Sequence, residues 1–492
     1  MERFLPRPAL VASLAPKSFD DARRLVALTP AGASAIEYRL DLAPVRLSPR
    51  ALLELDPRPA IMTWRTVREG GKFAGGADEY RRAVQSAYDA GATVDVELDS
   101  GLLAETGFLP NRRRVVASRH GGAVSEDALR AYAGCNAGAL KIVQKEPETV
   151  SEAIACLEKT RAISRERPVS IFAMGPRGIL TRILGARFGA ALTYGSVEAE
   201  TGPGQIPLED LLRLYRVDGA TRPDRLLAVY GRDVSESLSP EIYNRLFQEH
   251  GRPWLYVPVS ASRREDGAEA PLSRDLAALE SLWHNLFGVS VTNPFKGDFG
   301  GVAQPDDETR RLGAANTLVR CRPDCFDFSA HNTDTAAVGE VLGRLPGSRV
   351  VVVGTGGAAR AAVAAATAHG RIVGVAGRDG AKAQALARAL GVAALDGVAG
   401  ELADVWINAT PLGSREGDPL PIPREILGGR PAVIDFVYCR SGETALVALA
   451  RKAGCEIVDG LELLARQAAH QARLFGVSGA SFEEIIAIVR RA

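Results

Sequence analysis

The first 200 residues alternate short apolar runs with longer stretches of helical character. Eight runs have the length of a buried strand: residues 9–14, 35–40, 60–63, 93–98, 114–118, 139–143, 169–174 and 191–194. Strands that alternate with helices form parallel βα units, and eight such units make a (β/α)8 barrel. The pattern therefore predicts a barrel, with an open doubly wound sheet as the alternative.

The second half continues the alternation and adds a glycine motif. A strand is predicted at residues 226–230, and valines at 350–353 precede Gly354, Gly356 and Ala359, which fit G-x-G-x-x-A. In this motif the first glycine forms a tight turn, the second admits a pyrophosphate, and the third small residue lets the helix pack on the strand. The helix that follows would direct its N-terminus at phosphate. We expect a nucleotide-binding sheet here.

A polar stretch separates the two patterns. Between residues 215 and 226, Gly219 and Pro223 interrupt the alternation, as is typical of a linker. We therefore place a barrel at 1–222 and a two-lobed α/β unit at 223–492. In that unit, residues 223–333 and 459–492 would form one lobe, and a Rossmann-like lobe would span 334–458.

Composition narrows the function further. The 492 residues carry a net charge of +1 and are 46% hydrophobic, with no apolar run long enough to cross a bilayer. There is thus no electrostatic case for a nucleic acid or membrane partner. The N-terminus lacks a signal-peptide core, and the six cysteines are scattered without zinc-type spacing. We expect a cytoplasmic protein with reduced thiols and no metal.

Lysine and histidine stand on neighbouring barrel strands. Lys141 lies between Leu140 and Ile142 and would point into the barrel. Burial disfavours an ammonium, and a neutral amine can attack a ketone to form a Schiff base. His120, one strand earlier, could carry the proton, with Glu69 orienting it. The alternatives are a lysine that extends to solvent and a histidine that lies at the surface or is satisfied in the core.

Further polar residues fall at the ends of predicted strands, where a barrel carries its chemistry. They are Glu37, Arg39, Arg65, Arg182, Thr201 and Gln205. A structural ion-pair network is the alternative reading for the charged ones, and it is compatible with substrate binding.

Residues 8–217 resemble the type I 3-dehydroquinate dehydratases. The similarity rests on E-Y-R-L-D, T-W-R-T-V-R-E-G-G, S-R-H, A-L-K-I-V, M-G-P-R-G-I-L-T-R and T-G-P-G-Q, in the family's order. It implies that Lys141 forms the imine, that His120 is the general acid and base paired with Glu69, and that the six residues just named line the substrate site. Gly121-Gly122 and Thr201-Gly202 depart from the family pattern.

Two titratable residues mark the second unit. Lys296 and Asp334 follow apolar runs, together with the neutral hydrogen-bonding residues Thr292, Asn316 and Thr333. This mixture suits a small polyhydroxylated acid, although a surface ion pair is the alternative. Ser239, before Pro240, has the position of a helix N-cap, whereas Ser237 has no such role.

Residues 226–477 resemble shikimate dehydrogenase. The shared motifs are S-x-S-L-S-P, V-T-N-P-F-K, G-A-A-N-T, N-T-D, G-T-G-G-A-A-R, N-A-T-P-L-G and D-G-L-x-L-L-x-x-Q. The resemblance implies that Lys296 and Asp334 are catalytic. The implied substrate-binding residues are Ser237, Ser239, Thr292, Asn316, Tyr438 and Gln467, and the implied cofactor-binding residues are Gly354, Gly356, Gly357, Ala358, Arg378 and Thr410. Departures from the family are Phe295, Thr335, Gly377 and Cys439-Arg440.

The cofactor depends on Gly377-Arg378-Asp379, after the second strand of the nucleotide-binding unit. Arg378 suits the 2′-phosphate of NADP, whereas Asp379 could bind the ribose of NAD. We favour NADP, and no cofactor for the barrel.

Together the resemblances imply two consecutive steps, from 3-dehydroquinate through 3-dehydroshikimate to shikimate, with these small molecules as the expected partners. A lysine aldolase fused to a quinate-type dehydrogenase, and an NADP-sensing binding protein, are the alternatives.

Overall fold

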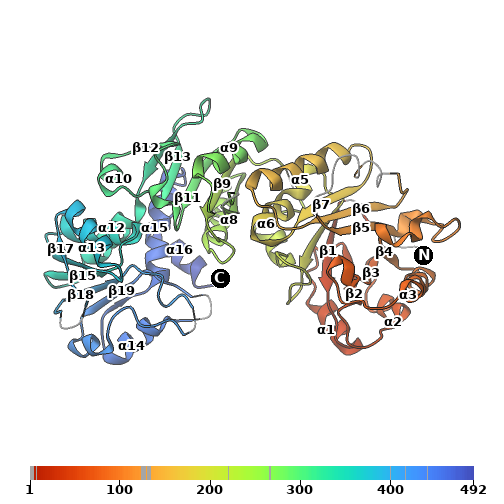
Figure 1. Cartoon of the computed structure of the whole chain (residues 1–492), viewed down its shortest axis with the longest axis horizontal. Coiled ribbons are helices and arrows are strands. Elements are labelled where there is room, and N and C mark those ends of the chain that lie inside the picture. The colour runs from red at the N-terminus through yellow and green to blue at the C-terminus, as the bar shows by residue number, and fades with distance from the viewer. Residues whose placement is uncertain are drawn as a thin grey trace.

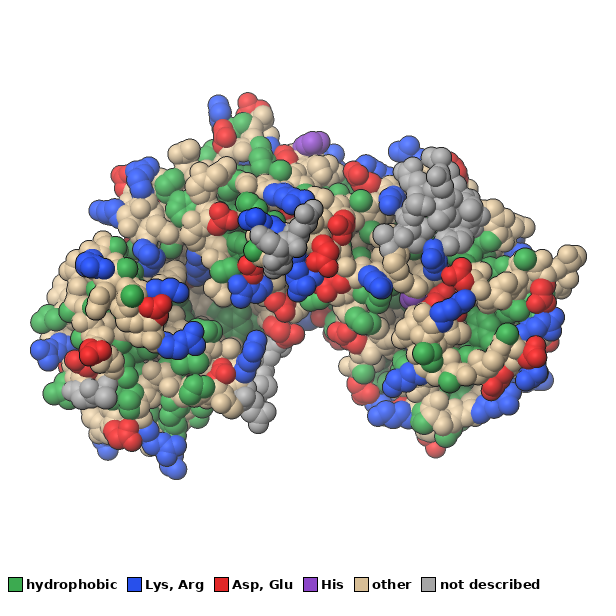
Figure 2. All heavy atoms as spheres, in the orientation of Figure 1, with side chains coloured by type: hydrophobic (Ala, Val, Ile, Leu, Met, Phe, Trp, Pro, Cys, Tyr) green, Lys and Arg blue, Asp and Glu red, His purple; other side chains and the backbone are tan. Residues whose placement is uncertain are grey.

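The computed structural model describes residues 5–6, 8–122, 129, 134–219, 221–264, 268–398, 401–415, 417–439 and 442–491. Within these ranges the strands form three sheets, one of eight strands and two of six. Figure 1 shows the first sheet and its helices on one side of the molecule and the other two sheets on the opposite side. In the space-filling view the two halves meet along one edge, and a notch separates them below it (Figure 2).

The first sheet is a parallel barrel. Its strands are β1 (Ala9–Leu14), β2 (Ala35–Arg39), β3 (Ala60–Thr63), β4 (Thr93–Glu97), β5 (Val115–Gly121), β6 (Ala139–Gln144), β7 (Val169–Ala173) and β8 (Leu192–Ser196). They follow the order β7-β6-β5-β4-β3-β2-β1-β8, with parallel pairing throughout. All eight predicted strands are present, shifted by at most three residues at either end. The predicted barrel is confirmed.

The two end strands of this sheet close the barrel. The Ala191 N–H donates to the Val169 carbonyl at 2.9 Å, and the Ser170 hydroxyl bonds to both the N–H and the carbonyl of Leu192. The helices around the barrel are α1 (Phe19–Leu28), α2 (Pro49–Leu53), α3 (Ala77–Asp89), α5 (Val150–Ile163), α6 (Gly175–Leu184) and α7 (Leu208–Arg213). The barrel interior includes an apolar cluster that contains Val11, Ile61 and Val116.

The second sheet is mixed and forms the lobe in which the sequence predicts substrate binding; we call it the substrate lobe. It comprises β9 (Arg225–Gly231), β10 (Trp254–Ser260), β11 (Leu286–Val291), β12 (Ala303–Pro305), β13 (Thr317–Arg320) and β14 (Phe328–His331), in the order β10-β9-β11-β13-β14-β12. β13 is antiparallel to both of its neighbours. The helices of this lobe are α8 (Ser239–Glu249), α9 (Leu272–Trp283), α10 (Asp307–Leu312), α15 (Gly460–Leu474) and α16 (Phe482–Val489).

The third sheet is entirely parallel. Its strands are β15 (Arg349–Val353), β16 (Ile372–Ala376), β17 (Ala393–Ala394), β18 (Val405–Asn408), β19 (Ala432–Asp435) and β20 (Ile457–Val458), with helices α11 (Thr333–Leu342), α12 (Gly357–Ala368), α13 (Gly380–Leu390) and α14 (Ala445–Ala453). The order β17-β16-β15-β18-β19-β20 is the 3-2-1-4-5-6 order of a dinucleotide-binding fold. The strand order switches between β15 and β18, next to the glycine motif that follows β15.

The barrel packs on the substrate lobe through α5 and α6, against α9 and β10. The Ser262 hydroxyl accepts a hydrogen bond from the Val150 N–H at 2.8 Å and donates to Asp275, while the Arg263 N–H donates to the Glu148 carbonyl. Phe188 and Trp283 stack across the interface with ring centroids 5.2 Å apart. One apolar cluster runs from the barrel into the lobe, so the two halves share a core.

Candidate active sites

Lys141 lies inside the barrel on β6 and is 6% exposed. Its Nζ donates to Glu37 Oε1 at 3.1 Å and to Asp95 Oδ2 at 3.4 Å, and it lies 4.0 Å from the centroid of the Tyr194 ring. The surroundings are therefore anionic, not apolar as the flanking Leu140 and Ile142 suggest. These two neighbours point out of the barrel, whereas β2 and β4 direct carboxylates inward.

Glu37 is held by three donors. Ser13 donates to its Oε2 at 2.6 Å, and Thr63 and Lys141 donate to its Oε1 at 3.0 and 3.1 Å. Burial alone would raise the pKa of Glu37, but the positive charges of Lys141 and Arg39 outweigh it and bring the pKa below its ordinary value. Glu37 is therefore ionised beside the Lys141 amine.

His120 and Glu69 form a pair above Lys141. The backbone N–H of His120 and its ring Nδ1 lie 3.0 and 3.2 Å from Glu69 Oε2, to which Arg65 also donates at 2.9 Å. Burial, followed by the charges of Arg65 and Lys141, holds the pKa of His120 well below its usual range. Burial raises the pKa of Glu69 to about 7 against the pull of Arg65. The imidazole is thus neutral at neutral pH and can accept a proton.

Arg65 joins these groups into one network. Its guanidinium donates to Asp95 at 2.8 Å, Glu97 at 3.2 Å and Ser118 at 3.0 Å. The ion-pair network that the sequence leaves open as an alternative is therefore present. The network includes Asp95, which also contacts Lys141. The ion-pair network and the buried lysine are therefore both present.

The loop after β8 completes the barrel site. Thr201 Oγ1 lies 2.6 Å from Ser13 Oγ and 2.8 Å from Gln205 Oε1, and Arg39 donates to the Thr201 carbonyl. Arg182 donates to the Pro203 carbonyl at 3.3 Å, while its buried Nε has no partner among the described residues. Burial lowers the pKa of Arg182 to about 10. Arg182 thus offers a charged donor for an anion.

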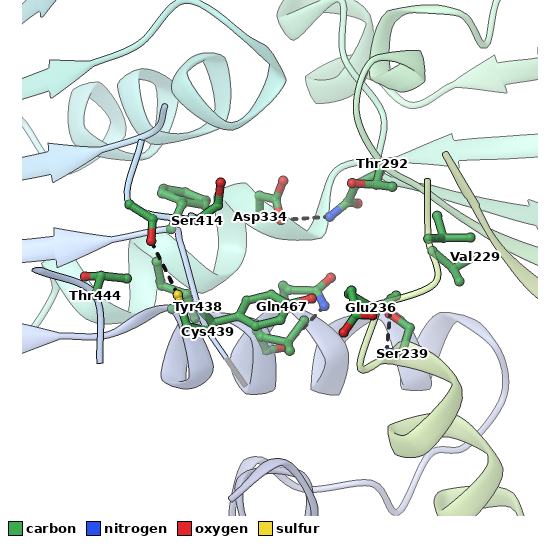
Figure 3. A pocket seen from close by; sticks show the side chains of 18 of the residues that line it. Val229, Glu236, Ser239, Thr292, Asp334, Ser414, Tyr438, Cys439, Thr444 and Gln467 are labelled. Atoms are coloured by element: carbon green, nitrogen blue, oxygen red, sulfur yellow. Dashed lines mark hydrogen bonds between the residues drawn. The ribbon is translucent and has the colours of Figure 1, made fainter. Parts of the chain in front are cut away.

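A second site lies between the substrate lobe and the nucleotide-binding sheet. It is a cavity of about 1010 Å³. All eight residues that the sequence assigns to catalysis or substrate binding in this half line it: Ser237, Ser239, Thr292, Lys296, Asn316, Asp334, Tyr438 and Gln467. Figure 3 shows Tyr438 and Gln467 between the nucleotide side, with Ser414 and Thr444, and the substrate side, with Ser239.

Lys296 and Asp334 meet inside this cavity. Lys296 Nζ lies 2.6 Å from Asp334 Oδ2, and Asn316 Nδ2 donates to Asp334 Oδ1 at 3.0 Å. Thr333 Oγ1 accepts from Asn316 Nδ2 at 2.9 Å and donates to Gln467 Oε1 at 3.2 Å. Asp334 is 6% exposed. The Lys296–Asp334 pair is therefore shielded from solvent and is not a surface ion pair.

The predicted N-cap role of Ser239 is wrong. Helix α8 begins at Ser239 itself, its N-cap is Leu238, and no side chain caps it. Instead, Ser237 Oγ accepts from the Ser239 N–H at 3.2 Å, and the Ser239 hydroxyl bonds to Tyr256. Pro240 therefore takes the second helical position and not the first, and its fixed φ suits either position in the first turn. Both serines line the cavity.

The glycine motif has the shape that a dinucleotide needs. Gly354 has a φ of 133°, and a Cβ there would lie 2.7 Å from the Ala409 carbonyl oxygen. Gly356 is the N-cap of α12 and has open space where a side chain would be. At Gly357 a Cβ would lie 2.8 Å from the Lys296 side chain. The first turn of α12, which contains Ala358, thus begins beside the Lys296–Asp334 pair.

Arg378 and Asp379 follow β16 at the same edge. Asp379 caps α13 by accepting from the Lys382 N–H at 3.1 Å, whereas Arg378 is exposed. Thr410 Oγ1 donates to Asn408 Oδ1 at 2.7 Å and accepts from the Leu412 N–H, which fixes the loop after β18. These residues fit a dinucleotide with an additional phosphate near Arg378.

Two protein families match separate regions of the chain. Residues 11–222 match the type I 3-dehydroquinase family, and residues 229–318 match the shikimate dehydrogenase substrate binding domain. An NADP(+) shikimate dehydrogenase from Rubrobacter xylanophilus is 34% identical over 268 residues, which are 51% of this chain and 89% of that protein. The chain belongs to the shikimate dehydrogenase family. In front of that part it carries a type I 3-dehydroquinase domain.

Other relatives cover one or both halves. A chloroplastic bifunctional 3-dehydroquinate dehydratase/shikimate dehydrogenase from Arabidopsis thaliana is 28% identical over 480 residues, 90% of this chain and 78% of that protein. The crystal structure of shikimate 5-dehydrogenase from Thermus thermophilus, in complex with NADP(H) and shikimate, is 27% identical, covers 54% of this chain and 99% of that one, and has a TM-score of 0.48.

Several residues of both sites are missed by sequence reasoning. In the dehydrogenase half, Gln471 accepts from Ser290 at 2.6 Å and donates to Thr317 at 2.6 Å and to the Asn316 carbonyl at 3.2 Å, thereby supporting Asn316. Its signal is its place one helical turn after Gln467. In the barrel the missed residues are Ser13, Asp95, Glu97, Ser118 and Tyr194.

Two features are absent from the described ranges. None of their helices is long and apolar enough to span a bilayer. No group of three or more His, Cys, Asp or Glu side chains in the same ranges could hold a metal ion.

Proposed function

We propose that the barrel dehydrates 3-dehydroquinate to 3-dehydroshikimate and that the second half reduces this product to shikimate with NADPH. The observation that carries the proposal is the pairing of two separate sites in one chain. One site has a buried lysine with a neutral histidine on the next strand, and the other has a shielded Lys–Asp pair beside a dinucleotide turn. The name of the Arabidopsis relative contains both activities, and the name of the Rubrobacter relative contains the second.

In the dehydratase site the first step is deprotonation of Lys141. Glu37 and Asp95 lie within hydrogen-bond reach and can take its proton. The amine then attacks the ring ketone, and the carboxylate returns the proton to the oxygen that leaves as water. The product is a protonated imine, which draws electrons from the neighbouring C–H bond. Neutral His120, oriented by Glu69, removes that proton and returns it to the β-hydroxyl, which departs as water. A further water hydrolyses the imine and frees Lys141.

The substrate carboxylate needs a cation at the mouth of the barrel. Arg182 has a buried guanidinium with an unpaired Nε among the described residues, beside the loop that holds Thr201 and Gln205. Charge-assisted hydrogen bonds from arginine suit a carboxylate. We assign the carboxylate to Arg182, and the ring hydroxyls to Glu37, Arg39, Arg65, Thr201 and Gln205.

In the dehydrogenase site the lobes hold substrate and cofactor on opposite sides of the cavity. NADPH, when bound, supplies the hydride. Lys296 gives a proton to the carbonyl oxygen as that oxygen becomes a hydroxyl, and Asp334 holds Lys296 in place through their 2.6 Å contact. Ser237 and Ser239 lie where hydroxyls can bind the carboxylate. Thr292, Asn316, Tyr438 and Gln467 line the rest of the cavity.

We assign cofactor binding to the turn after β15. Gly354, Gly356, Gly357 and Ala358 form the cradle for the pyrophosphate, and Thr410 fixes the opposite loop. The 2′-phosphate of NADP is assigned to Arg378, because the carboxylate of Asp379 is engaged in capping α13. We also propose a cytoplasmic location, which the six free cysteines support.

The test is product analysis with 3-dehydroquinate and NADPH. The intact chain should form shikimate and consume NADPH. Lys141→Met should stop before any product, and Lys296→Met should accumulate 3-dehydroshikimate. Lys145→Met, at an exposed lysine just after β6, is the matched control and should behave like the unaltered chain.

Other outcomes would contradict the proposal. Cleavage of a carbon–carbon bond would indicate an aldolase in the barrel. Binding of NADPH without turnover would indicate a sensing protein.

A further inference from the structure

Tyr194 is a buried aromatic residue in the same layer of the barrel as Lys141. It lies on β8, is 3% exposed, and packs edge-on against Phe172 with ring centroids 6.3 Å apart. Its ring centroid lies 4.0 Å from Lys141 Nζ. The nitrogen is therefore enclosed by a carboxylate from β2, a carboxylate from β4 and the face of an aromatic ring from β8.

The ring, and not the hydroxyl, makes this contact. The Tyr194 hydroxyl is buried and has no hydrogen-bond partner among the described residues. Burial, with the nearby charges of Glu37 and Asp95, raises the pKa of Tyr194 well above its ordinary value, so the phenol stays neutral. A phenol with no partner contributes no bond to the network, whereas its ring is placed by Phe172 and the strand.

The number of N–H groups on Lys141 changes during the reaction. An ammonium has three, and two of them serve Glu37 and Asp95. A protonated imine keeps one N–H and a full positive charge, so the nitrogen can then donate to only one of the two carboxylates. Attraction to an aromatic face needs no N–H and is strongest where water is excluded. The ring therefore stabilises both forms of the nitrogen.

We propose that Tyr194 is a positioning residue for the dehydration, whose ring face holds the cationic nitrogen of Lys141 when the imine replaces the ammonium. This inference rests on the proposed Schiff-base function of the barrel. It adds a requirement for an aromatic ring at residue 194 and no requirement for its hydroxyl.

The experiment compares Tyr194→Phe, which keeps the ring, with Tyr194→Leu, which replaces it by an apolar side chain. Each full-length variant is mixed with saturating 3-dehydroquinate and borohydride, and the fraction of chains carrying reduced ligand on Lys141 is measured by mass spectrometry beside kcat. Tyr194→Phe should match the unaltered chain. A desolvated cation–π contact implies that Tyr194→Leu lowers the trapped fraction and kcat by about tenfold to thirtyfold.

Two controls separate this effect from misfolding. Shikimate oxidation by the second half should stay unchanged in each variant, because Tyr194 lies outside that site. If Tyr194→Leu is unstable, Tyr194→Met is used in its place. Methionine is flexible and fills the same space without a ring, so this variant should show the same loss.

The outcomes are distinct. Equal trapping in the leucine, methionine and unaltered chains would overturn the proposal, as would an equal loss in Tyr194→Phe, which would assign the role to the hydroxyl. Failure of the unaltered chain to trap ligand on Lys141 would instead refute the Schiff-base function.

Discussion

Replacing Ser262 with alanine removes one oxygen that serves both halves of the molecule. This oxygen accepts from the Val150 N–H at the first turn of α5 and donates to Asp275. Ser262 is fully buried, Val150 is 1% exposed, and Asp275 is 1% exposed with further donors in the Tyr230 hydroxyl and the Ser262 N–H. The variant leaves a buried N–H without a partner and removes one bond from a buried carboxylate.

The expected loss follows from these two contacts. An unsatisfied buried donor costs about 1–3 kcal/mol and a bond to a charged acceptor contributes about 1.5–3 kcal/mol, so a combined loss of ~2–4 kcal/mol is expected because both pass through one atom. Urea unfolding is followed separately by residual dehydratase and dehydrogenase activity. Both curves should move to lower urea, since the bond ties one half to the other.

The matched control is Ser281→Ala on α9, the helix that carries Asp275. Its hydroxyl is exposed and donates only to the Ala278 carbonyl one turn earlier, so the curves should stay in place. If Ser262→Ala also left both curves unmoved, or moved only the dehydrogenase curve, the reasoning that this contact couples the halves would be refuted.

Three further predictions concern the sites. Lys296→Ala should lower the kcat of shikimate oxidation by about 10²–10⁴-fold, the usual value of general acid–base catalysis, and a change confined to NADPH affinity would contradict the role. Arg378→Ala should weaken NADPH relative to NADH by about tenfold to a hundredfold, as expected for a charge-assisted bond; an unchanged ratio of the two dissociation constants would exclude it. The pKa of Glu69 is raised in the fold to about 7, so its stabilising contribution is complete below its unfolded value near 4.5 and is lost as pH rises through 7. Relative to Glu69→Gln, the unaltered chain should therefore lose stability between about pH 5 and about pH 8 in urea unfolding, and a parallel dependence in the two chains would disprove it.

The sequence predicts the strands of the barrel closely because their periodicity is local. Motif spacing also brings Lys296 and Asp334 to one cavity, although 38 residues separate them. Asp95 is missed because its run, T-V-D-V-E, has the pattern of an ordinary strand. Only the structure shows that β4 brings this residue next to Lys141. Tyr194 is missed for a related reason, since an aromatic residue in a strand is most often core.

Periodicity and motif spacing do not predict contacts between distant elements. Ser262 bonds to Val150, 112 residues away, and no local pattern distinguishes that serine from any other loop serine. The predicted N-cap at Ser239 is wrong by one residue. Proline fits either of the first two helical positions, so the sequence alone does not decide between them.

The path of α15 and α16 has a consequence for the order in which the protein can fold. Both helices lie after the nucleotide-binding sheet in the chain, yet they pack on the substrate lobe, where Phe475 and Ile485 share a core with Leu227 and Tyr243. At a synthesis rate of about 5–20 residues per second, the apolar faces of β9 and β10 wait roughly 10–50 s for these helices. The barrel is continuous in the chain and can close long before then. During translation its α5 and α6 are thus the first partners that the unfinished lobe meets.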